Sequence, residues 1–426
     1  MQILMSHPTG NSNVRAVIKT LCQENILAEF NTTIGLSSDH YLMSILSNKL
    51  GDQLSRRSFP LSSSMLKSHP LTEIARLMLP RLGLKRFVKQ EHSWASIDSV
   101  YRNLDHHVAR RIIARKSTKD YTAVYGYEDG ALESFRAAKE RGLTCIYDLP
   151  IAYWETSRRL MKEEAIRLPD WAITLAGGIQ DSAEKLERKT QELELADIVV
   201  APSDFVLASI PAWAENKHMV LAPFGSPTTR GLLTKSSSTK ENSKLRVLFA
   251  GSMSQRKGLG DLFNAMKLID TDKVELIVMG SLMAPMSFYR AQFPSFTYMP
   301  NRPHHQVLEL MRSCDVLCLP SIVEGRALVM QEAMSQGLPI IITAHTGGAD
   351  LIIEGKTGFL IPIRSPEAIA EKISWFLKNR TRTSEMRAHA QTHAAAYTWE
   401  TYGATIVSAI MEFQTSHGYA RHSFIP

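Results

Sequence analysis

The chain has 426 residues, of which 44% are hydrophobic and 21% are charged, so its composition is that of an ordinary folded protein with two or three domains. No apolar run approaches the roughly 18–20 residues that cross a bilayer, and four cysteines in so long a chain exclude a disulfide scaffold. The formal net charge of +7 is modest for this length.

In the first half, short apolar runs alternate with longer amphipathic stretches, a pattern typical of α/β proteins with mainly parallel sheets. The expected strands are Gln2–Ser6, Asn31–Gly35, Ala123–Tyr125, Thr144–Asp148 and Asp197–Ala201. The expected helices are Asn13–Gln23, Gly130–Arg141 and Ile179–Ala196. Prolines and a glycine between Asp52 and Arg111 predict several short helices there rather than one long helix.

The stretch from Arg81 to Lys119 is basic, with ten Lys or Arg and three acids. Such an excess attracts phosphates of nucleic acid, anionic lipid or a charged substrate. No nucleic-acid module is recognisable, so we expect no nucleic-acid partner. The alternatives left are a solvated basic helix, carrying Arg110, Arg111 and Arg115, and peripheral contact with a membrane. Because Met1–Pro8 lacks the features of a signal peptide, we expect a cytoplasmic protein, at the inner face of the membrane if this stretch binds lipid.

A polar segment rich in Ser, Thr and Lys, residues 226–244, then separates this alternation from a second one and predicts a linker. The strands expected after it are Leu245–Ala250, Val274–Met279, Ser295–Tyr298, Val316–Pro320, Ile340–Ala344 and Gly358–Ile361. The helices expected after it are Gly258–Leu268, His305–Arg312, Leu328–Gln336 and Pro366–Asn379. We therefore predict two doubly wound α/β domains, residues 1–225 and 245–399, with a ligand site in the cleft at the carboxyl ends of their strands. Cys314 and Cys318 fall in a predicted buried strand, where we expect packed thiols.

The segment Gly251–Gly258 follows a predicted strand and opens a helix, so its backbone amides favour an anion. Arg256 and Lys257 lie beside that helix start and are suited to hold a diphosphate. An ordinary capped surface helix is the alternative.

A second constellation contains two carboxylates, Glu324 in a turn after a buried strand and Glu332 about two helical turns further on. They are too far apart along the helix to share a proton, and this spacing suits two tasks along one extended ligand. Glu332 has apolar neighbours, so its burial would demand a polar partner.

The frame around these residues, S-x-x-E-G-x₅-Q-E-A-M-x-x-G-x-P, resembles the E-x₇-E signature of the retaining glycosyltransferases of family 4 (glycosyl transferases group 1). The segments Gly251–Gly258, Thr346–Asp350 and Gly355–Leu360 resemble further elements of that family, and the likeness is continuous from about Val199 to Phe413. It implies the GT-B fold, in which two Rossmann-like domains face each other across a cleft. Residues 1–225 would bind the acceptor, residues 245–399 would bind the nucleotide sugar, and residues 400–426, as a terminal helix, would cross back to the first domain.

The resemblance also implies roles for single residues in a metal-independent hexosyltransferase without a cofactor. Arg256 and Lys257 would neutralise the donor diphosphate, Glu332 would bind the ribose, and Glu324 would hold the transferred sugar, with Asp148 as a further catalytic residue. The expected donor site is completed by the loop residues Gly251 and Ser252 and by the backbone of Gly325, Arg326, Ala327, Leu328 and Val329. The expected acceptor contacts are Gly10, Asn11 and Tyr147. The acceptor would be a glycan, a lipid-linked sugar or another hydroxyl compound.

Three positions depart from the family pattern. Tyr147 occupies a position where the family often has His, Arg326 is an unusual cation after Glu324-Gly325, and the first loop lacks a Gly-Gly run. Tyr147 and Arg326 leave open a catalytically silent paralogue that binds a nucleotide sugar or glycan. A GT-B nucleotide-sugar epimerase or hydrolase is the other alternative.

Overall fold

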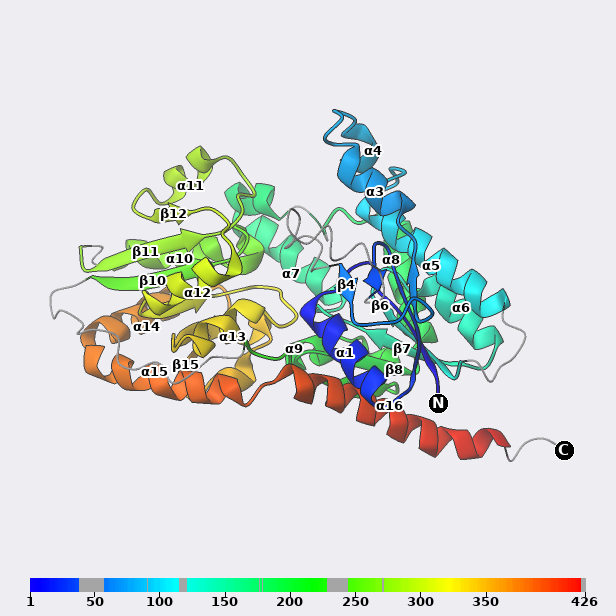
Figure 1. Cartoon of the computed structure of the whole chain (residues 1–426). Helices are drawn as coiled ribbons and strands as arrows, with labels where there is room; N and C mark the ends of the chain where they lie inside the picture. The colour runs from blue at the N-terminus through cyan, green and yellow to red at the C-terminus, as the bar shows by residue number, and fades with distance from the viewer. Residues whose placement is uncertain are drawn as a thin grey trace.

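The computed structural model describes residues 1–37, 57–89, 91–114, 121–175, 177, 179–227, 244–269 and 272–422, with side chains to residue 416. Within these residues the chain forms two large parallel sheets, each flanked by helices (Figure 1). This arrangement confirms the predicted α/β architecture with two doubly wound units. Most of the linker predicted at 226–244 lies outside the described residues.

The first sheet has seven strands, all parallel to their neighbours. In spatial order they are β5 (Leu66–Ser68), β2 (Leu27–Thr32), β1 (Ile3–Ser6), β6 (Ala123–Tyr127), β7 (Thr144–Asp148), β8 (Ile198–Ala201) and β9 (His218–Leu221). The strand predicted at 31–35 begins earlier, at Leu27, because the buried Leu27 and Phe30 are the residues that pack in the core. The edge strand β5 was not predicted. A separate two-stranded sheet joins β3 (Leu36–Ser37) to β4 (Ser58–Phe59).

Helices cover both faces of the first sheet. On one face, α1 (Ser12–Gln23) packs against α16 (Trp399–His422), whose Tyr402, Ile406 and Ile410 are buried in the core. The terminal helix therefore crosses back to the first domain, as the GT-B resemblance implies. The other face is covered by α5 (Ile97–Ala114), α6 (Leu132–Glu140) and α8 (Ala183–Leu195).

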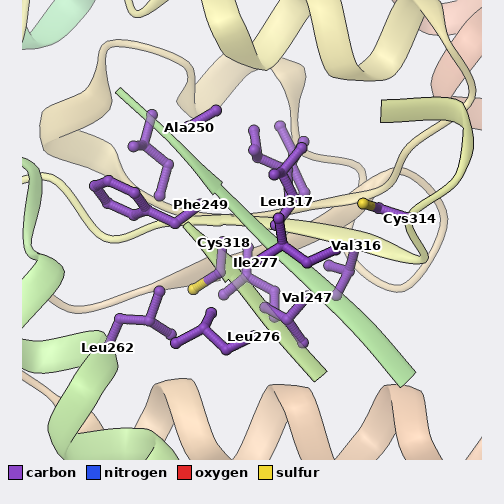
Figure 2. Packing of buried hydrophobic residues seen from close by; sticks show 14 of the residues in the cluster. Val247, Phe249, Ala250, Leu262, Leu276, Ile277, Cys314, Val316, Leu317 and Cys318 are labelled. Carbon is purple, nitrogen blue, oxygen red and sulfur yellow. The ribbon is translucent and has the colours of Figure 1, made fainter. Parts of the chain in front are cut away.

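The second sheet has six parallel strands and its own hydrophobic core. In spatial order they are β12 (Thr297–Met299), β11 (Val274–Met279), β10 (Leu245–Ala250), β13 (Val316–Leu319), β14 (Ile340–Thr343) and β15 (Gly358–Ile361). Figure 2 shows Val247 and Phe249 of β10 packed among residues of the neighbouring strands and Leu262. Cys314 and Cys318 are buried free thiols of this core, which confirms the expectation of packed thiols.

The second domain has six α-helices among the described residues, and four of them lie where the apolar periodicity predicts. The six helices are α10 (Leu259–Lys267), α11 (Met286–Gln292), α12 (His304–Arg312), α13 (Leu328–Ser335), α14 (Pro366–Lys378) and α15 (Arg380–Ala395). The sequence pattern missed α11 and α15. The short helix α9 (Asp204–Ala208) follows β8 in the first domain.

One segment of the first half packs on the second domain. It consists of α7 (Trp154–Arg167) and the 3-10 helix η1 (Pro169–Thr174). The Trp171 ring contacts the edge of the Phe263 ring with 5.8 Å between centroids, and Arg167 forms an ion pair with Asp261 at 2.7 Å. The two domains are therefore joined by a buried contact in addition to the chain connection.

The region from residue 57 to 114 contains two short helices followed by a long one. The short helices α3 (Leu71–Met78) and α4 (Arg86–Lys89) agree with the predicted short helices, whereas α5 is longer than expected. Figure 1 shows α3 and α4 standing away from both sheets. Among the helices that the structure describes, none is both long and apolar enough to span a bilayer.

Candidate active site

The loop after β10 carries the two cations that were predicted to bind phosphate. Arg256 and Lys257 end the 3-10 helix η3, which stops at Gly258. Gly258 has a φ of 74°, in the region that favours glycine. A Cβ atom there would lie 2.0 Å from the carbonyl oxygen of Pro320, so this loop packs backbone against backbone on the carboxyl end of β13.

Gly251 and Ser252, at the start of the same loop, lie beside the loop that follows β11. A Cβ atom at Gly280 would lie 1.7 Å from the carbonyl oxygen of Gly251, and both glycines have φ near 150°. The side chain of Ser252 is 3.4 Å from the Ser254 hydroxyl. The glycines thus allow the ends of neighbouring strands to approach closely at the predicted donor site.

Glu324 joins both cations to the turn after β13. Its Oε1 atom lies 2.8 Å from the Arg256 Nη1 atom and 2.6 Å from the Lys257 Nζ atom. The Lys257 ammonium is largely buried, and burial lowers its pKa, while Glu324 raises it and Arg256 lowers it further. Arg256 and Glu324 are 68 positions apart in the sequence, and the two segments that contain them therefore form one cluster of charges, as the resemblance implies.

Gly325 is the place where the two domains touch next to this cluster. A Cβ atom at Gly325 would lie 1.7 Å from the carbonyl oxygen of Pro150, in the loop after β7. The hydroxyl of Ser203, in the loop after β8, donates a hydrogen bond of 2.6 Å to the Gly325 carbonyl oxygen. The cluster of Arg256, Lys257 and Glu324 therefore lies at the carboxyl ends of strands of both sheets, which is the usual ligand position in doubly wound folds.

Arg326, the unusual cation after Glu324-Gly325, has its side chain turned into the second domain. Its side chain is fully buried, and its guanidinium forms two hydrogen bonds to Asp350, of 2.7 and 3.0 Å. Its Nη1 atom also donates to the Gly347 carbonyl oxygen at 2.9 Å, and its Nε atom donates to Gln331 at 3.0 Å. These partners hold the Arg326 side chain inside the second domain.

The start of α13 supplies backbone amides to the same cluster. The N–H groups of a helix's first turn have no acceptor within the helix, so those of Leu328 and Val329 suit an anionic ligand. The amide of Ala327, however, donates to the Thr346 carbonyl oxygen at 3.1 Å. The predicted role of the Ala327 amide in phosphate binding is therefore corrected, since that amide is already used by the protein.

Glu332 lies on α13 with its side chain 21% exposed. Burial raises its pKa, and the nearby His304 opposes this shift. The His304 Nδ1 atom is 3.7 Å from the Glu332 carboxylate. His304, at the start of α12, is thus the polar partner whose identity the sequence did not disclose.

The Asp148 carboxyl is surrounded by tyrosine side chains of the first domain and the terminal helix. The hydroxyl of Tyr125 donates to its Oδ2 atom at 2.7 Å, and the carboxyl is buried. Burial raises the pKa of Asp148 to about 7, against hydrogen bonds from Tyr125, Tyr127 and Tyr402 that lower it. The structure therefore does not support the predicted catalytic contact of Asp148, because tyrosines from β6 and α16 enclose the carboxyl.

Tyr147 faces the opposite side of the first sheet and is fully buried. Its ring packs edge-on against Phe135, with 6.3 Å between centroids. Successive residues of a strand point to opposite faces, so Tyr147 and Asp148 could not both face one ligand. The predicted acceptor contact of Tyr147 is corrected accordingly.

The first loop, between β1 and α1, packs against other residues of the first domain. A Cβ atom at Gly10 would lie 2.6 Å from the Phe59 ring, and the Arg15 Nε atom donates to the Gly10 carbonyl oxygen at 2.8 Å. Asn11 is exposed at the start of α1 and accepts a hydrogen bond of 3.2 Å from Thr9. Gly10 thus packs closely against Phe59, whereas the Asn11 side chain is open to solvent. Both remain predicted acceptor contacts.

His7 is a residue of this edge that the sequence pattern did not single out. It follows β1 directly, and its ring contacts Tyr127 edge-on, with 4.5 Å between centroids. Burial lowers the pKa of His7 to about 4, so the imidazole is neutral at physiological pH. The only signal in the sequence is its place at the end of a predicted parallel strand.

One cation of the basic stretch is paired with a carboxylate of the first domain. The Arg111 Nε atom donates to Glu29 at 2.9 Å, so this guanidinium is held by a carboxylate of β2. Arg110 and Arg111 line a pocket of about 400 Å³ with the stacked rings of His69 and His107. Arg115, Lys116 and Lys119 lie outside the described residues.

Solved structures with the same arrangement define the fold class. Anabaena HepE in complex with UDP superposes with a TM-score of 0.60 at 14% identity, covering 97% of this chain and all of that chain. The lipopolysaccharide glycosyltransferase WaaG superposes with a TM-score of 0.57 at 14% identity, covering 96% of this chain and 99% of that chain. The protein therefore has the GT-B fold, with two Rossmann-like domains across a cleft and a terminal helix that returns to the first.

The second domain carries the family signature. Residues 233–395 match the family model of the glycosyl transferases group 1, which confirms the resemblance inferred from the motifs. Among curated relatives, a D-inositol 3-phosphate glycosyltransferase of Corynebacterium urealyticum is 29% identical over 118 residues, which are 28% of each chain. A putative colanic acid biosynthesis glycosyltransferase of Salmonella typhimurium, WcaL, is 35% identical over 81 residues, or 18% of this chain and 20% of that protein. The chain thus spans less than a third of the length of these relatives in either alignment.

Proposed function

We propose that this protein is a retaining, metal-independent glycosyltransferase that moves a sugar from a nucleotide-diphosphate sugar to a hydroxyl group of a glycan or lipid-linked acceptor. The observation that carries the proposal is the contact of Arg256 and Lys257 with one oxygen of Glu324, at the carboxyl end of β13 and beside the interdomain contact at Gly325. The family match over residues 233–395 and the UDP complexes of GT-B neighbours support it.

In this proposal, Arg256 and Lys257 hold the donor diphosphate. Their two positive charges and the first-turn amides of α13 supply the positive potential that would otherwise come from a metal ion. Negative charge grows on the diphosphate as the glycosidic bond breaks, so these groups bind the transition state more tightly than the ground state. Glu324 orders both cations before the donor arrives and is placed to orient the transferred sugar.

Glu332 is proposed to bind the ribose hydroxyls. Its half-buried carboxylate already has a partner in His304, and a ribose would add hydrogen bonds that a buried carboxylate needs. The retention of anomeric configuration is inferred from the E-x₇-E frame alone. The acceptor is expected on the first domain, where His7 and Asn11 follow β1 at the carboxyl end of the sheet.

The alternative of a catalytically silent paralogue was based on Tyr147 and Arg326. Both side chains are buried in the protein, where Tyr147 packs against Phe135 and Arg326 pairs with Asp350. Binding without turnover, or hydrolysis without an acceptor, are nevertheless distinct outcomes of the test below.

Calorimetric titration with nucleoside diphosphates and their sugars, followed by an assay of nucleoside diphosphate release with and without candidate acceptors, tests the proposal. Binding of one nucleotide sugar together with acceptor-dependent release is the expected result. Release that is independent of every acceptor would indicate a hydrolase, and binding without release would indicate a silent binding protein. Failure of all nucleotides to bind would overturn the proposed donor site.

A further inference from the structure

A protruding part of the first domain presents large apolar side chains to solvent. It comprises residues 71–89 and 91–97, with α3, α4 and the start of α5, and is called the arm below. Leu71 is 79% exposed, Leu82 67% and Trp94 61%, and the other exposed apolar residues of the arm are Ile74, Met78, Leu84 and Ile97. Figure 1 shows α3 and α4 standing away from the two sheets. A group of large exposed apolar side chains on one part of a protein marks a site of interaction.

Helix α3 has its apolar side outward and its polar side inward. Leu71, Ile74 and Met78 are spaced by three and four residues, so they share one side of the helix, and all three are exposed. Glu73 is only 3% exposed, and Arg76 holds its carboxylate at 2.7 Å. A helix on the surface of a protein in water normally has the reverse arrangement. The outward side of α3 therefore fits an apolar environment better than it fits water.

The arm combines these apolar residues with an unbalanced positive charge. Between Ile74 and Gln90 the sequence has five Lys or Arg and no Asp or Glu. Residues 81–86, in which Leu82 and Leu84 are flanked by Arg81, Lys85 and Arg86, are all exposed. Leucines beside lysines and arginines are typical of segments that lie in the interface of an anionic bilayer. A purely apolar protein partner would account for the leucines but not for the excess of cations, since the two acids of the arm, Glu73 and Glu91, accept hydrogen bonds from Arg76 and Ser182.

Hydrogen bonds fold the end of the arm back against α4. The Ala95 amide donates to the Phe87 carbonyl oxygen at 3.0 Å, and the Ser93 hydroxyl donates to the Arg86 carbonyl oxygen at 3.0 Å. They hold the exposed Trp94 beside α4, in the same arm as Leu82 and Leu84. Tryptophan is favoured at the boundary between water and lipid because its ring is apolar and its N–H is polar.

We propose that the arm docks the protein on the surface of an anionic lipid bilayer. The apolar residues would enter the interface, and Arg81, Lys85 and Arg86 would pair with lipid headgroups. These three cations lie within the basic stretch Arg81–Lys119 for which membrane contact was expected, whereas Arg111 of that stretch is bound to Glu29. The inference goes beyond the proposed glycosyl transfer and does not depend on it.

Co-sedimentation of the full chain with phosphatidylcholine vesicles, with and without phosphatidylglycerol, tests the docking. Binding is expected to vesicles with phosphatidylglycerol at low salt and to weaken at high salt, because screening reduces surface electrostatics. Leu82→Ser with Lys85→Glu should lower the partition coefficient at least about tenfold, since each cation near an anionic surface is worth roughly fivefold and the leucine adds to it.

The matched control is Lys267→Glu with Leu268→Ser, an exposed cation and an exposed leucine at the end of α10 in the second domain. It should bind vesicles like the parent. Quenching of tryptophan fluorescence by brominated lipid should also occur in the parent and fall in Trp94→Phe. Equal sedimentation of the arm variant and the parent, or no binding of the parent at low salt, would overturn the proposal. So would a dimer in velocity sedimentation that the arm variant abolishes, because the arm would then serve a second copy of the chain.

Discussion

At the scale of single residues, Glu324 sets the geometry of the candidate site because one of its oxygens contacts both Arg256 and Lys257. The three groups are largely buried, so their mutual attraction is stronger than it would be in water. A donor diphosphate would enter a site in which the cations are already ordered. The cost of ordering two long side chains is therefore met before the ligand binds.

Lys257→Ala is expected to lower kcat/KM for the donor by roughly 10²–10³, because the variant loses a charge contact that strengthens as the diphosphate departs. Steady-state release of nucleoside diphosphate measures this. Lys267→Ala, an exposed lysine on α10, is the control and should behave like the parent. Parental turnover in folded Lys257→Ala would contradict the role assigned to this residue.

Glu332→Ala is expected to act on binding more than on the chemical step. Contacts to ribose hydroxyls exist in the ground state and in the transition state alike, so the KM for the donor should rise more than kcat falls. The same kinetic assay gives both constants, with Glu309→Ala on the exposed side of α12 as the control. A fall in kcat at constant KM would assign Glu332 to the chemistry instead.

At the scale of elements, α16 is joined to the first sheet through Tyr402, which is one of the three tyrosines around Asp148. The pKa of Asp148 is raised to about 7 in the folded protein, well above its ordinary value of 3.8. Between about pH 4 and pH 7 the folded state therefore binds more protons than the unfolded state. The stability that Asp148 contributes to the folded state is present at low pH and is lost as the pH rises through the pKa of Asp148 in the folded protein.

Asp148→Asn should remove this dependence. The free energy of unfolding of the variant minus that of the parent should be larger at pH 8 than at pH 5, by up to about 1.4 kcal/mol per pH unit across the window, because only the parent loses stability as the pH rises. Urea denaturation at both values measures it. The difference cancels the contribution of other buried acids such as Asp105 and Glu192, which both proteins share. An equal difference at both pH values would show that Asp148 does not titrate there.

The strands of the second domain were predictable because parallel strands buried on both faces are continuous apolar runs, as in Leu245–Ala250. The position of Glu324 beside Arg256 and Lys257 followed from the family frame. The partner of Arg326 did not, since Asp350 lies 24 residues later and only the tertiary fold brings it within 2.7 Å. The same holds for the tyrosines around Asp148, one of which comes from the terminal helix.

The arm shows a different limit of sequence patterns. The spacing of Leu71, Ile74 and Met78 predicts an amphipathic helix, but not which side packs on the protein. The structure puts Glu73 inside and the leucine outside. A charge count over residues 81–119 likewise could not show that Glu29 holds Arg111.

At the scale of the whole molecule, contacts already tie the domains together at one end of the cleft. Arg364 pairs with Glu164 of α7, Arg167 pairs with Asp261, and Ser203 bonds to the Gly325 carbonyl. The loop with Arg256 and Lys257 takes part in these contacts, since the Gln255 side chain donates to Glu164 at 2.8 Å, so a closing motion would carry α7 with the second domain. Domain closure of this kind is a common response to ligand binding.

Saturation with a nucleotide sugar is therefore expected to reduce the radius of gyration. Small-angle X-ray scattering of the free and saturated protein checks this, with a nucleoside that lacks phosphates as the control ligand. Unchanged dimensions at saturation would mean that the domains are already closed before the donor binds.

Hydrogen–deuterium exchange with the tightest-binding nucleoside diphosphate tests the location of the donor site most directly. We expect the ligand to slow exchange in peptides covering residues 251–258 and 324–332 together, and Lys257→Ala to abolish this protection at the same ligand concentration. Protection confined to the first domain, for example around the cavity of about 580 Å³ lined by Arg102, His106 and Arg188, would contradict it.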